Sequence, residues 1–130
     1  MKYLGIDYGT KRIGIAISDS DGVLAFPNSI IENTKKDAQV FSTLLNIIEK
    51  ENIKKIILGE SLDYSGKQNK IMKEIKKFSE KIQKEFSLPV HFEKEFLTSV
   101  EARRYKDNKR EADASASALI LQRYLDRINK

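Results

Sequence analysis

The chain has 130 residues, a length typical of one domain, and we expect a single domain over residues 1–130. It contains no cysteine, which excludes disulfides and thiolate metal sites. Its 24 Lys and Arg against 19 Asp and Glu give a formal charge of +5, and the excess lies in the second half. Such a surface is either simply solvated or binds a polyanion, most plausibly nucleic acid. Because neither a secretory signal nor an 18-residue apolar run is present, we expect a cytoplasmic protein with no membrane partner.

The first third of the chain predicts three strands joined by short turns. Lys2–Tyr8 and Arg12–Ser18 are apolar runs, and Gly9 in the link between them is free to take a positive φ. A second turn, SDSDG, precedes a third strand over Val23–Ile31, bent near Pro27. Three successive strands with short turns favour an antiparallel meander.

The spacing of apolar residues then changes to that of helices alternating with strands. Residues 33–52 predict a helix, with Thr34 and Asp37 as a capping pattern at its start. A buried strand follows over residues 53–59, and then a second helix over Gln68–Phe86. Val90–Lys94 predicts a fifth strand on which His91 points outward to solvent, and 99–106 a helical turn.

A polar segment, KDNKRE, leads to a last helix over Ala112–Ile128, whose small residues allow close approach to the layer beneath. The order β-β-β-α-β-α-β-α predicts an α/β fold, a mixed five-stranded sheet with helices on both faces. The first strand becomes central, because the later parallel strands add beside it.

Three acids stand in unusual places. Asp7 lies at the end of an apolar strand, Glu95 just past the last strand, and Asp113 at the start of the last helix. Ligand sites in such sheets lie beyond the carboxyl ends of the strands. Taken singly, Asp7 can cap the turn that follows it, Glu95 can be a solvated loop acid, and Asp113 can favour a helix N-terminus.

Together these acids point to a divalent cation. Buried like charges are costly unless a cation neutralises them. An all-carboxylate site without Cys or His selects Mg²⁺ or Mn²⁺. A pair of such ions is used for in-line displacement at phosphorus, and a basic periphery suits a phosphodiester substrate. The sequence therefore predicts metal-dependent phosphodiester chemistry at Asp7, Glu95 and Asp113.

Four segments resemble one known family. LGIDYGTKRIGIAISD, ILGESLDYSGKQN, EFLTSVEAR and ADASASALILQRYL are similar to motifs of the YqgF family of pre-16S rRNA nucleases and Holliday-junction-resolvase-like proteins. The resemblance implies a ribonuclease-H-like fold and a divalent-metal nuclease acting in 5′-end maturation of 16S rRNA. It carries the three catalytic and metal-binding acids onto Asp7, Glu95 and Asp113.

The chain departs from the family pattern at two places. Lys94-Glu95-Phe96 stands where the family usually has Asp-Glu-Arg, and Gly59-Glu60-Ser61 replaces Gly-x-Pro. Glu60 directly follows a strand expected beside that of Asp7, so it is a candidate fourth metal ligand that offsets the missing acid at Lys94. The alternative is that Glu60 points into solvent.

Residues near these acids are candidates for binding the nucleic-acid backbone. They are Thr10, Lys11, Arg12, Arg103, Arg104, Lys109 and Arg110, of which the last four lie in a loop between two of the site acids. A solvated turn and a solvated loop are the alternatives, and the lysines of the second helix are expected to be solvated.

Four functions remain open at the level of sequence. The first is an endonuclease on structured RNA, with precursor 16S rRNA as partner. The second is a Holliday junction resolvase-like nuclease on branched DNA, which normally needs a homodimer rather than a monomer. A non-catalytic RNA-binding protein of the same fold is the third. The fourth, an actin-like ATP-binding module, is disfavoured because the chain is too short and has no second Asp-x-Gly loop.

Overall fold

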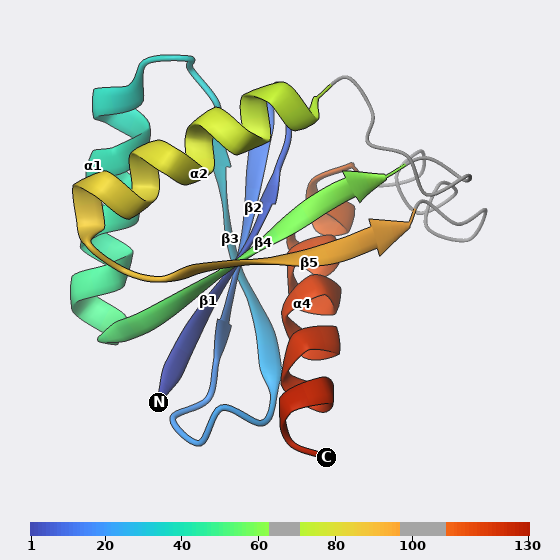
Figure 1. Cartoon of the computed structure of the whole chain (residues 1–130). Helices are drawn as coiled ribbons and strands as arrows, with labels where there is room; N and C mark the ends of the chain where they lie inside the picture. Colours follow the sequence, from blue (N-terminus) through green and yellow to red (C-terminus); the bar gives the residue numbers. More distant parts are fainter. Residues whose placement is uncertain (63–70, 97–108) are drawn as a thin grey trace.

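A five-stranded mixed sheet forms the centre of the molecule (Figure 1). The computed structural model describes residues 1–62, 71–96 and 109–130. In chain order its elements are β1 (Lys2–Tyr8), β2 (Arg12–Ser18), β3 (Ala25–Glu32), α1 (Asp37–Glu51), β4 (Ile53–Leu62), α2 (Met72–Phe86), β5 (Val90–Phe96) and α4 (Lys109–Ile128).

The strand order is β3-β2-β1-β4-β5, which confirms the predicted central position of β1. β1, β2 and β3 form the predicted antiparallel meander, while β4 pairs in parallel with β1 and β5 in parallel with β4. The carboxyl ends of β1, β4 and β5 therefore meet at one edge of the sheet. This is the edge at which the sequence predicts the site acids.

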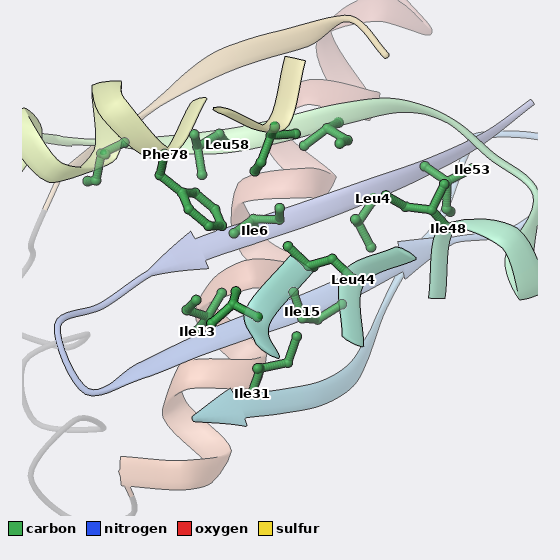
Figure 2. Packing of buried hydrophobic residues seen from close by; sticks show 14 of the residues in the cluster. Leu4, Ile6, Ile13, Ile15, Ile31, Leu44, Ile48, Ile53, Leu58 and Phe78 are labelled. Carbon is green, nitrogen blue, oxygen red and sulfur yellow. The ribbon is translucent and has the colours of Figure 1, made fainter. Parts of the chain in front are cut away.

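Each face of the sheet is covered by helices and has its own apolar core. α1 and α2 cover one face, and the side chains between them and the sheet form the larger core (Figure 2). It includes Leu4 and Ile6 of β1 and Ile56 and Leu58 of β4. α4 covers the opposite face, where Ala16 and Ile57 pack against its apolar side. Successive residues of a strand thus alternate between an α1/α2 face and an α4 face.

The elements differ from the sequence prediction mainly at their ends. β1 and β2 have the predicted bounds, whereas β4 and β5 run on to Leu62 and Phe96. β3 begins two residues later than predicted because the Asp19 carboxylate accepts hydrogen bonds from the N–H groups of Val23 and Leu24, which holds them in a turn.

The predicted capping pattern at the start of α1 is wrong. The helix begins at Asp37 after Lys36, and no side chain caps it. The Thr34 hydroxyl instead accepts a hydrogen bond from the N–H of Lys36, at 3.2 Å, in a local turn. The predicted helical turn at 99–106 lies outside the described residues. Within the described part of the chain, no helix combines the length and apolarity needed to cross a membrane.

Candidate active site at the end of the central strand

Asp7 lies near the carboxyl end of the central strand, on the face that α4 covers. Its neighbours Ile6 and Leu4 are buried in the core of the α1/α2 face, so Gly5 and Asp7 project to the other face. A Cβ placed on Gly5 would lie 2.8 Å from Cβ of Leu121 and 3.0 Å from the carbonyl oxygen of Ser117. α4 therefore packs directly on β1 one pleat before Asp7, and Asp7 is half-buried there.

α4 runs antiparallel to β1. Tyr124, toward its end, contacts Tyr3 near the start of β1 with ring centroids 5.8 Å apart, whereas Ser117 and Leu121 lie over Gly5. Position 113 is one turn before Ser117, about 6 Å further along the helix. Asp7 is about 6.6 Å beyond Gly5 along the strand. The backbone of Asp113 is therefore brought level with Asp7.

Two details of this helix correct the sequence prediction. Asp113 does not begin the helix, because α4 starts at Lys109 and Asp113 is in its second turn. Lys109 and Arg110 consequently lie in the first turn of α4 and not in a loop. The side chains of these residues, like all of Arg103 and Arg104, lie outside the described part of the structure.

Glu95 belongs to the same face as Asp7 by its position in the sheet. It is in β5, opposite Ser61 of β4, and not past the end of the strand as predicted. Glu93, two residues earlier, contacts Arg127 of α4, so the backbone position of Glu95 belongs to the α4 face of β5 by the alternation of the strand. Gly59 pairs with Glu93 and directly follows the Ile6–Leu58 pair, so Glu93 and Asp7 correspond in the strand register.

The backbone positions of Asp7, Glu95 and Asp113 thus share one face and one end of the sheet. The side chains of Glu95 and Asp113 are not described. Among the side chains that the structure describes, no three of the types His, Cys, Asp or Glu are grouped so as to hold a metal ion.

Glu60 lies on the opposite face from Asp7. Ile56 and Leu58 belong to the α1/α2 core and Ile57 to the α4 core, so Glu60 falls on the α1/α2 face. The prediction of Glu60 as a fourth ligand considered only the shared edge of the sheet. Because Glu60 and Asp7 are on opposite faces of the sheet, the structure does not support that prediction. In the register of β4 and β5, Glu60 is beside Lys94, so the two unusual residues are neighbours of opposite charge.

The turn between β1 and β2 follows Asp7 directly. Thr10 and Lys11 are exposed, and Arg12, half-buried at the start of β2, is on the same face as Asp7 because Ile13 is in the α1/α2 core. Gly9 does not adopt the positive φ that was open to it, since Gly22 is the glycine with positive φ in the described chain. Gly9 is needed for another reason: a Cβ there would lie 2.5 Å from the carbonyl oxygen of Arg12.

Asn33, at the end of β3, holds this turn, and sequence reasoning did not single it out. Its side-chain amide donates to the Gly9 carbonyl oxygen at 2.9 Å, and its backbone N–H donates to the Lys11 carbonyl oxygen at 2.9 Å. An asparagine directly after a strand was the available signal, but it is also common in ordinary turns.

A second group of charged residues fixes the other end of α4. The side chain of Glu93 is only 7% exposed and forms an ion pair with Arg127, with N–O distances of 2.5 and 2.9 Å. His91 contacts the Tyr124 ring at 4.9 Å, so it faces α4 rather than solvent, contrary to the prediction. Burial lowers the pKa of His91, and the positive charges of Lys55 and Arg127 lower it further.

Comparison with known proteins finds relatives that match nearly the whole chain. A protein from Maridesulfovibrio salexigens named "Putative pre-16S rRNA nuclease" is 36% identical over 135 residues, covering 98% of this chain and 99% of that protein. One of the same name from Nitratidesulfovibrio vulgaris is 40% identical over 119 residues, covering 92% and 81%.

The fold is that of RuvC, which confirms the ribonuclease-H-like prediction. The structure of Thermus thermophilus RuvC in complex with a Holliday junction substrate aligns with a TM-score of 0.64 at 13% identity, over 98% of this chain and 96% of that one. A family profile described as "RuvX: Holliday junction resolvase" matches residues 1–127. With this match over almost its whole length, the chain belongs to the RuvX family.

Proposed function

We propose that this protein is a divalent-metal-dependent endonuclease that hydrolyses phosphodiester bonds in structured RNA. Its substrate is the precursor of 16S rRNA, whose 5′ end it matures in the cytoplasm. Curated relatives with the name of a pre-16S rRNA nuclease match this chain over nearly the full length of both. The proposal therefore rests on the whole domain and not on a shared fragment.

The observation that carries the proposal is the placement of Asp7. The central strand presents this half-buried carboxylate on the α4 face, at the sheet edge where three parallel strands end. A carboxylate in that place can bind a divalent cation together with neighbouring acids, since carboxylate oxygens are the ligands that Mg²⁺ and Mn²⁺ prefer. The positions of Glu95 and Asp113 on the same face supply the further acids.

The donor set fits a hard cation. Asp7, Glu95 and Asp113 would hold it with carboxylate oxygens, and a chain without cysteine offers no thiolate ligand. Oxygen ligands of this kind suit Mg²⁺ or Mn²⁺. When bound, such an ion makes water a stronger nucleophile near neutral pH and stabilises charge on the phosphate.

The remaining residues of the site hold and orient the substrate. Gly14, which is buried and has no side chain, is opposite Asp7 in the β1–β2 register. Arg12, on the same face, and Thr10 and Lys11 in the adjoining turn would contact the phosphates that flank the cleaved bond. Arg103, Arg104, Lys109 and Arg110 would bind further phosphates of the same strand.

A second candidate is a Holliday junction resolvase-like nuclease acting on branched DNA. The description of the matching family and the junction-bound RuvC structure favour it. Such an enzyme would act as a homodimer, because two strands must be cut at one junction. The two candidates share their chemistry and differ in substrate and in oligomeric state.

The deciding experiment is a cleavage assay with both substrates. A precursor-rRNA 5′ fragment and a four-way DNA junction are incubated with the protein in Mn²⁺, in Mg²⁺ and in EDTA, with Asp7→Asn as the inactive control. We expect metal-dependent cutting of the RNA by the wild type alone. Cutting of the junction only, by a dimer in size-exclusion chromatography, would favour the second candidate. Equal cutting by Asp7→Asn would contradict both.

A further inference from the structure

Asn33 connects the end of the third strand to the turn that follows Asp7. It uses its backbone N–H for the Lys11 carbonyl oxygen and its side-chain amide for the Gly9 carbonyl oxygen, both at 2.9 Å. Its side-chain oxygen accepts a third hydrogen bond, from the N–H of Lys35 at 3.2 Å. One half-buried residue therefore joins two loops at the same edge of the sheet.

These hydrogen bonds determine the shape of the turn beyond the point at which the β2–β3 pairing ends. The last β2–β3 pair is Arg12 with Glu32, so Asn33 lies one residue beyond the ladder. Only three residues join β1 to β2, and the Arg12 carbonyl lies close to Gly9. This turn therefore has few alternative conformations. The direction in which Thr10 and Lys11 project is therefore set by where Asn33 holds the carbonyl groups on either side of Thr10.

We propose that Asn33 is a positioning residue for substrate binding. It holds the Gly9–Lys11 turn so that Thr10 and Lys11 meet the phosphate backbone next to the bond at Asp7. The inference rests on the proposed nuclease function. It assigns Asn33 no contact with the substrate, and its effect passes through the turn alone.

The protein contains a matched control for the purely structural alternative. Asn129 donates its side-chain amide to the carbonyl oxygen of Gly22, also at 2.9 Å, and so braces the β2–β3 turn. That turn is at the opposite end of the sheet from Asp7, since β2 runs from Arg12 to Ser18 antiparallel to β1. Asn129→Ala and Asn33→Ala therefore each remove an amide brace from a turn, and they differ in their distance from the site.

The experiment compares these two variants with the wild type in binding and in cleavage. Binding of a fluorescein-labelled single-stranded RNA is measured by anisotropy in EDTA at several salt concentrations, and cleavage of the rRNA fragment is measured in Mn²⁺. We expect Asn33→Ala to weaken binding and raise KM roughly two- to tenfold, the equivalent of removing one hydrogen bond. We expect its salt slope to fall by about 0.7 for each phosphate of a single strand that the displaced turn no longer reaches.

Asn129→Ala should lower the melting temperature but leave the RNA affinity, the salt slope and KM at the wild-type values. Asn33→Ser, which retains an oxygen for the Lys35 N–H but cannot reach Gly9, should behave like Asn33→Ala and serves if the alanine variant folds poorly. Neither change at Asn33 should alter the rise in melting temperature that Mn²⁺ produces, because the metal ligands are untouched.

Two results would overturn the proposal. If Asn33→Ser and Asn129→Ala had the same RNA affinity and salt slope, Asn33 would be only a structural brace. If Asn33→Ser lost the response to Mn²⁺, it would act on the metal site and not on the substrate. A wild type that binds RNA but never cleaves it would refute the nuclease function while still testing Asn33, and one that does neither would refute both.

Discussion

Replacing Gly5 with alanine should separate α4 from the central strand. The new Cβ would lie 2.8 Å from Cβ of Leu121 and 3.0 Å from the Ser117 carbonyl oxygen. Carbon atoms pack at about 3.5–4.0 Å, so α4 must move away from β1 by about 1 Å. The neighbouring atoms are a helix carbonyl and a Cβ, which cannot turn aside as the end of a flexible side chain can.

The expected cost follows from this overlap. Overpacking a well-filled core costs about 1–3 kcal/mol, and alanine in place of a strand glycine recovers roughly 0.5–1 kcal/mol of backbone entropy. A net loss of about 1–2 kcal/mol should lower the melting temperature of a domain of this size by roughly 3–10 °C. Because α4 carries Asp113, the same shift should reduce cleavage by up to about 100-fold.

The assay measures both quantities beside a control in the other core. Ile75→Val, in α2, removes one methyl group from a buried side chain on the α1/α2 face and should cost about 0.5–1.5 kcal/mol. We expect this control to cleave at the wild-type rate at a temperature where all three proteins are folded. If Gly5→Ala also cleaved at the wild-type rate and kept its response to Mn²⁺, the reasoning that α4 sets the site would be refuted.

Asp7→Asn should abolish metal-dependent cleavage and the rise in melting temperature caused by millimolar Mn²⁺, while leaving the metal-free protein as stable or more stable; Glu60→Gln should keep both responses. A further prediction concerns the positive charges of Arg103, Arg104, Lys109 and Arg110. Removal of each charge should lower the salt slope of RNA binding by roughly 0.7, and a slope unchanged by all four removals would exclude these residues from the interface. The pKa of His91 is lowered on folding, so the unfolded chain binds this proton more readily and stability should fall as pH drops below about 6.5. His91→Gln should remove that part of the loss between pH 7 and 5 in thermal melts, and an unchanged profile would contradict the assignment.

The sequence predicted the sheet well because its signals there are local. β1 and β2 are short apolar runs bounded by turn residues, and they have the predicted bounds. The predicted starts of β3 and α1 were wrong because, in each case, a side chain accepts a hydrogen bond from an N–H group of a local turn. The Asp19 carboxylate holds Val23 and Leu24 in a turn, and the Thr34 hydroxyl binds the N–H of Lys36. Which of several nearby N–H groups a side chain accepts from is decided by tertiary packing and not by spacing.

His91 and Glu93 show a second limit of sequence reasoning. An isolated β5 offers a buried face and a solvent face, and a polar residue is expected on the latter. α4, which follows 12 residues after β5, covers that second face and turns it into an interior where Glu93 needs Arg127. The order of elements predicted helices on both faces of the sheet. That prediction implies that both faces of β5 can be covered, and the expectation that His91 points to solvent was inconsistent with it.

Two properties of a strand position decide which acids belong to the candidate site: whether it is at the carboxyl end of the strand, and which face of the sheet it is on. The end is readable from sequence, because parallel strands bring their carboxyl ends to one edge, and that criterion alone admitted Glu60 beside Glu95. The face follows from the alternation of successive residues along the strand, so it can be assigned once the face of one residue in that strand is known. Ile57 packs on α4, so odd positions of β4 face α4 and Glu60 does not. Glu93 contacts α4, so Glu95 shares its side, as Asp7 shares that of Gly5. A Mn²⁺ titration of Glu60→Gln beside Glu95→Gln tests this parity argument directly. Loss of the thermal response in Glu60→Gln, with retention in Glu95→Gln, would contradict it.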